Sequence, residues 1–282
     1  WIDVMSEVAF LAMDLEDRGQ RALAWRFLNR YLEATGDYAG IPVLRFYMVY
    51  RALVRAKVHL MRSRQPHLPR REKTRLSRAF REYLQLAARC AAPGRAALMI
   101  THGPSGCGKT TATQPLIELL GAVRIRSDLE RKRLHRLAPL AASGSGLDAG
   151  IYTRAAGAAT YRRLGALART IVRAGFPVVI DAAFLERPQR IAFRALAERL
   201  EAAFLILDFR APVPVLRARI ARRRARANDA SEADVAVLER QLATRDPLTP
   251  AETAAALAVD AAAPLGHEAW RPVFGRLRRM AG

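Results

Sequence analysis

A glycine-rich segment with a lysine and a threonine lies between an apolar run and a helical pattern. Residues 103–110 are GPSGCGKT, which fits the spacing G-x-x-x-x-G-K-[ST] without a gap. Glycines in such a loop let consecutive backbone N–H groups curl around a phosphate, and the helix that follows adds its positive end. Lys109 reaches the β- and γ-phosphates, and the Thr110 hydroxyl completes a Mg²⁺ shell. The residues that we expect to contact ATP are Gly103, Ser105, Gly106, Cys107, Gly108, Lys109, Thr110 and Thr111.

An aspartate at the end of a later apolar run is the second candidate for metal chemistry. Residues 177–181 are PVVID, so Asp181 falls at the C-terminal end of an expected strand, where open parallel sheets build their sites. Motor ATPases follow this aspartate with a glutamate that activates water, whereas Ala182 follows it here. Because a kinase must keep water from the γ-phosphate, this difference favours phosphoryl transfer. We expect Asp181 to hold Mg²⁺ with Thr110; the alternative is an aspartate that caps a turn.

Acidic and basic residues also follow the expected strand at 122–126. In SDLERKRLHR, Asp128, Arg131 and Lys132 lie at i, i+3 and i+4, on one face of a helix. Asp128 is the preferred base to accept a proton from the acceptor hydroxyl, and Asp181 is the second candidate. Arg131 and Lys132 are the candidates to bind an anionic part of the acceptor. The alternative is a helix cap followed by a solvated basic face.

An arginine-rich helix is expected within residues 215–241, and it ends in NDAS at residues 228–231, a turn and cap. Its arginines are Arg217, Arg219, Arg222, Arg223, Arg224 and Arg226. Arg219 and Arg223 are one turn apart, and such a pair can close over a nucleotide, neutralise the charge that develops during transfer and exclude water. The position after the fourth expected strand favours this lid. A solvated charged face and a nucleic-acid contact are the alternatives.

Five short apolar runs, separated by helical patterns, predict the elements that position these residues. They cover residues 96–101, 122–126, 177–181, 203–208 and 255–260. Strands that alternate with helices in this way form a parallel sheet with helices on both faces. Residues 141–150, AASGSGLDAG, are expected to form a loop within this domain. The pattern predicts a three-layer α/β/α P-loop NTPase fold over residues 93–282.

The N-terminal part of the chain shows helical spacing of apolar residues throughout. Four helices are expected there, over residues 3–18, 20–35, 42–63 and 71–91. The segment AAPGR at residues 91–95 is the expected boundary. Residues 1–92 are therefore predicted to form a smaller all-helical segment.

The charge and the cysteine content of the chain indicate which kinds of partner and which compartment to expect. The formal net charge is +21, yet only 4 of the 47 basic residues are lysines. Arginine beside this much alanine is typical of a codon bias, so the charge favours small anionic ligands over nucleic acid.

A disulfide from Cys107, one of the two cysteines, would obstruct the phosphate loop, which favours a reducing, cytoplasmic compartment. No apolar run reaches the roughly 18 residues of a membrane span, and the start at Trp1 within a helical pattern suggests a longer protein.

Residues 95–260 resemble a group of P-loop kinases with AAA-type ATP-binding domains that includes zeta-toxin-like, gluconate-kinase-like and chloramphenicol-phosphotransferase-like enzymes. The matching segments are GPSGCGKTT, RSDLERKRL, VVIDAAFLERPQR and RIARRRARANDASEAD. The resemblance implies nucleotide binding at residues 103–111, acceptor or metal roles for Asp128 and Asp181, and lid arginines within 219–226.

The helical segment carries a second resemblance. AFLAMDLEDRG, FLNRYLEATGDYAG and FYMVYRALVRAKV resemble the helical end of an aminoglycoside-phosphotransferase-like domain, which a bacterial family of fused proteins carries in front of such a kinase. That domain works through an H-x-D…N loop and a following metal-binding aspartate, and this sequence contains neither. The resemblance implies that the catalytic half precedes this chain, so we do not expect antibiotic phosphorylation from it.

Together these features predict an ATP- and Mg²⁺-dependent P-loop kinase that transfers the γ-phosphate to a hydroxyl group of a small molecule. Lys109, Arg219 and Arg223 would neutralise charge during transfer. A non-catalytic ATP-binding module that regulates a fused phosphotransferase is the first alternative, and a polynucleotide 5′-kinase is the second. The expected partners are a small-molecule acceptor and an upstream phosphotransferase-like domain, without membrane or nucleic acid.

Overall fold

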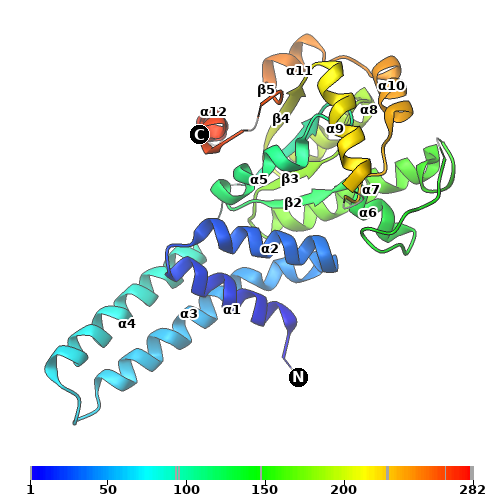
Figure 1. The fold of residues 1–282 in the computed structure, drawn as a ribbon. Helices are drawn as coiled ribbons and strands as arrows, with labels where there is room; N and C mark the ends of the chain where they lie inside the picture. The colour runs from blue at the N-terminus through cyan, green and yellow to red at the C-terminus, as the bar shows by residue number, and fades with distance from the viewer. Residues whose placement is uncertain are drawn as a thin grey trace.

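The computed structural model describes residues 2–92, 94, 96–146, 148–226, 229–263 and 265–279 (Figure 1). The helices are α1 (Val4–Asp17), α2 (Arg21–Thr35), α3 (Ile41–Ser63), α4 (Arg70–Ala91), α5 (Lys109–Leu120), α6 (Ser127–Leu134), α7 (Arg154–Arg173), α8 (Arg187–Arg199), α9 (Val213–Arg226), α10 (Val235–Thr244), α11 (Pro250–Ala255) and α12 (Arg271–Arg279). The strands are β1 (Ala97–His102), β2 (Val123–Arg126), β3 (Val178–Asp181), β4 (Ala203–Arg210) and β5 (Ala256–Asp260). Short 3₁₀ turns are η1 (Tyr38–Gly40), η2 (Gly150–Tyr152) and η3 (His267–Trp270).

The five strands form one parallel sheet in the order β2-β3-β1-β4-β5. Because all strands run the same way, their C-terminal ends meet at one edge, and the loop after the central β1 lies between the ends of β3 and β4. All five predicted strands are confirmed, each to within two residues at either end. The predicted P-loop NTPase fold is therefore confirmed.

Apolar side chains on opposite faces of the strands build two cores. On one face, Leu98, Ile100 and Ile180 pack with buried residues of α7 and α8. On the other face, Met99 and Val179 pack with residues of α5, α9, α10 and α12. A strand that is buried on both faces needs this continuous apolar sequence, which explains why alternation is weak in these runs.

The four predicted N-terminal helices are confirmed, each to within one residue at either end. α2 ends at Gly36, whose φ of 76° suits the left-handed cap that glycine tolerates. α3 and α4 form a long antiparallel hairpin that projects away from the sheet, whereas α2 lies against α5 and β2 (Figure 1). Helix α2 therefore makes the main contact between the N-terminal helices and the sheet domain.

The helical segment and the sheet share one core. The Trp25 ring of α2 meets the Phe176 ring edge-on, with the ring centroids 5.8 Å apart. Asn29 of α2 donates to the Ala122 carbonyl at 3.0 Å and accepts from the Arg124 N–H at 2.7 Å, so it extends the hydrogen bonding of β2. The predicted boundary lies at residues 91–95, of which Pro93 and Arg95 are outside the described residues. The chain passes there from the helical segment to the sheet, while the apolar core continues across both parts.

The arginine-rich helix is confirmed as α9, and a turn follows it as NDAS predicts, but helix α9 does not extend to residue 241. α9 ends at Arg226 and α10 begins at Val235. In the intervening segment the Asp229 carboxylate accepts from the Ser231 N–H, and the Asp234 carboxylate caps α10 by accepting from the Val237 N–H, both at 2.9 Å. Short aspartate side chains that bond the backbone in this way favour turns and helix starts over helix interiors.

Among the described residues, no helix combines the length and the apolar character that crossing a bilayer requires.

Candidate functional site

The loop after β1 needs its glycines for both backbone shape and space. Gly103, Gly106 and Gly108 have φ values of 138°, 85° and 78°, in the region that favours glycine. A Cβ atom on Gly106 would lie 2.7 Å from the Leu216 carbonyl oxygen of α9. The loop is therefore curled tightly and covered closely by α9.

The Lys109 ammonium lies inside the curve of this loop. Its Nζ donates to the carbonyl oxygens of Gly103 and Pro104, at 2.8 and 2.9 Å. The buried Cys107 thiol also donates to Pro104 O, at 2.9 Å. The loop carbonyls hold the one lysine that the sequence motif requires at the mouth of the phosphate cradle.

The two residues expected to hold Mg²⁺ lie side by side. Thr110 Oγ1, in the first turn of α5, donates to Asp181 Oδ2 at 2.5 Å, and Asp181 is buried at the end of β3. Mg²⁺ prefers hard oxygen ligands and retains several waters, so one hydroxyl and one carboxylate beside phosphate oxygens suit it. If Mg²⁺ binds, Thr110 and Asp181 would hold it, and it would neutralise charge on the phosphates.

Arg124 of β2 is a contributor to the site that sequence reasoning missed. Its guanidinium is buried, donates to Glu33 Oε1 of α2 at 2.7 and 2.9 Å, and donates to the Thr110 carbonyl oxygen at 2.7 Å. A buried ion pair of this kind holds its geometry because both charges need their partners. The signal was available, because an arginine inside the apolar run 122–126 must find a buried anion.

Asp128, the expected base, follows β2, the strand that pairs with the one ending in Asp181. Arg126 of β2 is paired in register with Asp181 of β3, and Asp128 lies two residues further, in the first turn of α6. Burial lowers the pKa of Arg126, but the carboxylates of Asp181, Asp128 and Asp229 outweigh it and raise the pKa overall. Arg126 Nη2 donates to Asp229 at 3.0 Å. Arg126 therefore links β2 to the segment before α10 and is a second missed residue.

The two basic residues expected on the acceptor side separate in the structure. The Arg131 guanidinium lies over the Tyr152 ring, 5.0 Å from its centroid, and 4.0 Å from the Asp128 carboxylate. Lys132 is buried instead, where its Nζ pairs with Glu232 at 2.9 Å and donates to Pro139 O at 3.3 Å. Arg131 thus remains beside Asp128, while Lys132 ties α6 to the segment that precedes α10.

The two arginines expected to form a lid, Arg219 and Arg223, also take different places. Arg219 Nη2 donates to the Ala262 carbonyl oxygen at 3.1 Å, and its Nη1 would lie 3.4 Å from a Cβ atom on Gly108. It therefore spans from the phosphate loop to the segment after β5. Arg223 Nη2 donates to the Ala233 carbonyl at 2.6 Å, within the segment that joins α9 to α10. Of Arg226, only the backbone is described.

A histidine and an aspartate, which sequence reasoning left aside, form a buried pair at the same edge of the sheet. His102 Nδ1 lies 2.7 Å from Asp208 Oδ1, and Arg210 Nε donates to Asp208 Oδ2 at 2.7 Å. Burial raises the pKa of Asp208, but hydrogen bonds from His102 and Arg210 lower it overall. The pair joins the ends of β1 and β4 directly below Gly103, and so it supports the start of the phosphate loop.

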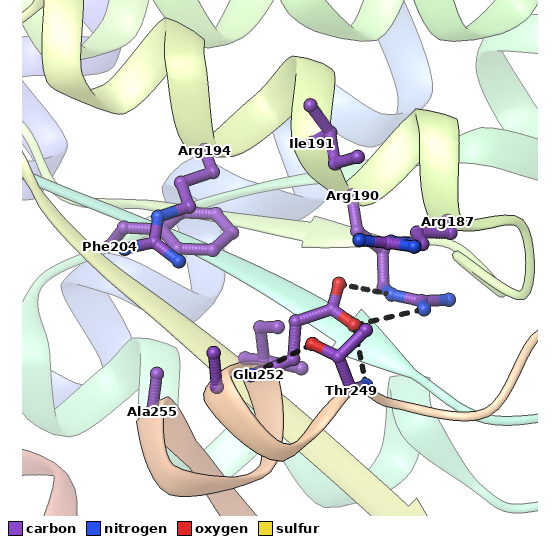
Figure 2. Close-up of a pocket in the computed structure, with 10 residues that line it drawn as sticks. Arg187, Arg190, Ile191, Arg194, Phe204, Thr249, Glu252 and Ala255 are labelled. Carbon is purple, nitrogen blue, oxygen red and sulfur yellow. Dashed lines mark hydrogen bonds and ion pairs between the residues drawn. The ribbon is translucent and has the colours of Figure 1, made fainter.

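A cavity of about 170 Å³ lies between α8, β4 and α11, away from these residues (Figure 2). Its polar side is closed by Arg190, which donates to both oxygens of Glu252 at 2.7 and 3.1 Å. Arg190 also donates to the carbonyl oxygens of Phe184 and Leu185, both at 3.2 Å. Because these groups satisfy one another, the cavity offers a ligand mainly apolar wall, and we assign it a structural role.

Two solved structures are similar to part of this chain. A putative kinase from Chloroflexus aurantiacus, of known structure, aligns with a TM-score of 0.51 at 21% sequence identity, over 66% of this chain and 98% of that one. A sugar kinase from Janibacter sp. aligns with a TM-score of 0.48 at 21% identity, over 67% of this chain and 99% of that one. The similarity to the Chloroflexus aurantiacus protein supports the P-loop NTPase fold that the strand order shows.

The chain is also 31% identical over 246 residues to an uncharacterised protein of Mycobacterium tuberculosis H37Rv, and equally to one of Mycobacterium bovis. The match takes in 87% of this chain but 48% of each relative, so the chain spans about half the length of the curated relatives it matches. The family model described as AAA domain matches residues 98–248, from β1 to the segment before α11. Since this match covers more than half of the chain, the protein belongs to that AAA domain family.

Proposed function

We propose that this protein is an ATP-dependent kinase that transfers the γ-phosphate to a hydroxyl group of a small molecule. The proposal rests on the placement of Lys109, the Thr110–Asp181 pair and Asp128 at or after the C-terminal ends of three neighbouring strands, β1, β3 and β2. Phosphoryl transfer needs little covalent chemistry from the protein. Positioning and charge neutralisation supply most of the rate, and these residues are of the types that provide both.

Each residue has a role in this proposal. The loop amides and Lys109 bind the phosphates, Thr110 and Asp181 hold Mg²⁺, and Arg219 covers the nucleotide from α9. Asp128 accepts the proton of the attacking hydroxyl, while Arg131 binds an anionic part of the acceptor. This sets Asp128 as the base ahead of Asp181, whose carboxylate is engaged by Thr110.

The Asp128→Asn variant tests the assignment of the base. It removes the proton acceptor without changing the size of the side chain, so turnover should fall by about 10²- to 10⁴-fold while ATP affinity stays nearly constant. Turnover is measured as ADP release with a panel of sugars, sugar acids, aminoglycosides and nucleosides, and ATP affinity by calorimetry.

The Asp14→Asn variant, on α1 far from the site, makes the same chemical change and should leave both quantities unaltered. Full turnover of the Asp128→Asn protein would exclude Asp128 as the base. Tight ATP binding by the wild-type protein without transfer to any acceptor would favour the regulatory ATP-binding module instead. Phosphorylation of an oligonucleotide 5′ end, steeply weakened by salt, would favour the polynucleotide kinase.

We further infer that a phosphotransferase-like domain accompanies this chain in the full-length protein and covers α3. One face of α3 carries exposed apolar residues at helical spacing, namely Val43, Phe46, Tyr50, Leu53, Val54, Val58 and Met61. Exposed apolar residues that gather on one face, unlike scattered ones, mark sites of contact with another protein surface. The curated relatives are about twice as long as the part matched, which supports a covering domain.

The division into a helical segment, 1–92, and a kinase domain, 93–282, is part of the same proposal. We also propose that the protein is located in a reducing, cytoplasmic compartment, because Cys90 and Cys107 are both free.

A further inference from the structure

A glutamine of α10 makes a hydrogen bond to the phosphate loop. Gln241 Oε1 accepts from the backbone N–H of Ser105 at 2.8 Å. α10 is held in place for this contact by Leu238, which is fully buried, and by Leu242, which packs against the same apolar cluster as Cys107. The contact therefore comes from an anchored helix and not from a chance surface side chain.

We expect the Ser105 N–H to face the β- and γ-phosphates of a bound nucleotide. The P-loop lysine reaches the β- and γ-phosphates, and the Lys109 ammonium here bonds to Gly103 and Pro104, the residues that immediately precede Ser105. One N–H group makes one good hydrogen bond. A β- or γ-phosphate oxygen and the Gln241 carboxamide oxygen therefore need the same donor.

We propose that Gln241 is a positioning residue of the phosphate site, whose carboxamide oxygen competes with the β- and γ-phosphates for the Ser105 N–H. Nucleotide binding breaks this bond and releases the Gln241 side chain of α10. The inference rests on the nucleotide site of the proposed function but not on the transfer step, so its test requires no acceptor.

A glutamine suits this role because its oxygen is neutral. It accepts a single hydrogen bond of ordinary strength, which a phosphate can displace. A carboxylate in the same place would accept a stronger, charge-assisted bond and would repel the incoming phosphates. The side chain at position 241 thus sets how much nucleotide affinity is lost to the competing hydrogen bond at Ser105.

The Gln241→Ala variant removes the competitor. Its affinity for MgATP, measured by titration calorimetry, should rise about two- to ten-fold, the range that corresponds to one net hydrogen bond. AMP, which lacks the β- and γ-phosphates, should bind the variant and the wild-type protein equally well. The Glu239→Ala variant, which truncates an exposed side chain of the same helix, should change neither affinity.

The Gln241→Glu variant should have the opposite effect, weakening MgATP by about ten-fold or more. A merely structural role of Gln241 would make both variants bind more weakly, so a loss of affinity in Gln241→Ala would overturn the proposal. An equal gain for AMP and ATP would also overturn it, because the contact would then lie elsewhere in the loop.

The two proposals fail in different ways. Absence of any nucleotide binding by the wild-type protein and by both variants would contradict the nucleotide site itself, and with it the kinase. Wild-type binding and transfer with unchanged affinities in both variants would contradict only the role of Gln241.

Discussion

At the scale of single residues, Arg219 and Arg223 show that equal spacing does not give equal roles. They are one turn apart on α9, but only Arg219 reaches both the phosphate loop and the segment after β5. Arg223 is turned toward the Ala233 carbonyl. The side-chain direction depends on where the helix lies over the loop, and helical periodicity contains no information about that.

The Arg219→Ala variant should therefore lose kcat/KM for phosphate transfer by at least about ten-fold, because a guanidinium over the nucleotide neutralises charge in the transition state. The measurement is steady-state ADP release with an acceptor found in the screen. Arg217→Ala removes an exposed arginine of the same helix that lies outside residues 219–226 and pairs with Glu239, and it serves as the matched control. Equal activity of the two variants would remove Arg219 from the lid.

Lys132 is the residue for which local spacing was least informative. On a helix it shares a face with Asp128, yet it is buried because Glu232 approaches from the segment before α10. The charge of Glu232 lies 100 positions along the chain, and no local pattern places it there. Ser105, Thr110 and Asp181, by contrast, could be placed from sequence because a motif and a strand end fix their positions.

At the scale of elements, α8 and α11 are joined by a buried ion pair with a clear pH signature. Arg190 is almost fully buried and donates to both oxygens of Glu252. Burial raises the pKa of Glu252, but hydrogen bonds from Arg190 and from Thr249 outweigh it and lower the pKa to about 2. The folded state therefore favours the ionised carboxylate more strongly than the unfolded chain does.

Because the pKa of Glu252 is depressed in the folded state, its contribution to stability is complete above the unfolded value of 4.5 and disappears as the pH falls toward about 2. We expect the free energy of unfolding, from urea titrations at several pH values, to fall across this range. Glu252→Gln should lower stability at pH 7 by about 3 kcal/mol, because it leaves Arg190 buried without its charged partner.

The same variant should flatten the pH dependence between pH 4.5 and about 2. Glu198→Gln, in an exposed pair with Arg194, should alter stability by less than about 1 kcal/mol and retain the slope. An unchanged slope in Glu252→Gln would mean that other carboxylates dominate the acid transition.

Elements were the part of the structure that the sequence predicted best. Five strands and the first four helices have the expected bounds, because apolar runs and helical spacing are local signals. The arginine-rich helix and the turn at NDAS were also predicted, but the extent of that helix to residue 241 was wrong. Asp229 and Asp234 form a turn and a cap, so residues 235–241 belong to a separate helix, α10.

At the scale of the whole molecule, the sequence indicated two parts but not how closely they join. Arg26 of α2 pairs with Glu118 of α5 at 2.7 Å, and Arg45 of α3 donates to the Gly175 carbonyl at 3.1 Å. These contacts link residues that are about 90 to 130 positions apart. Side-chain pairing over such separations depends on the assembled fold, so composition and periodicity could not reveal it.

The apolar face of α3 gives a prediction at this scale. In the full-length protein, amide hydrogen exchange along α3 should be slower than in residues 1–282 alone, because a covering domain excludes water. Replacing Phe46 and Val58 by serine should remove part of that protection, whereas Leu84→Ser on α4 should not. Equal exchange in both proteins would contradict the covering domain, and dimers of the 1–282 chain that the α3 variants dissociate would identify a second copy instead.

The ion pair between Glu33 and Arg124 constrains how this protein can change over evolutionary time. A recombined protein whose helix in the place of α2 carried no carboxylate at position 33 would keep the Arg124 guanidinium buried without its partner, at a cost of about 3–5 kcal/mol. That is a large share of the roughly 5–15 kcal/mol that stabilises a typical domain. Selection would act against genes that exchange one of the two parts at this boundary, unless position 124 had changed first. The ion pair therefore favours the retention of both parts in one gene.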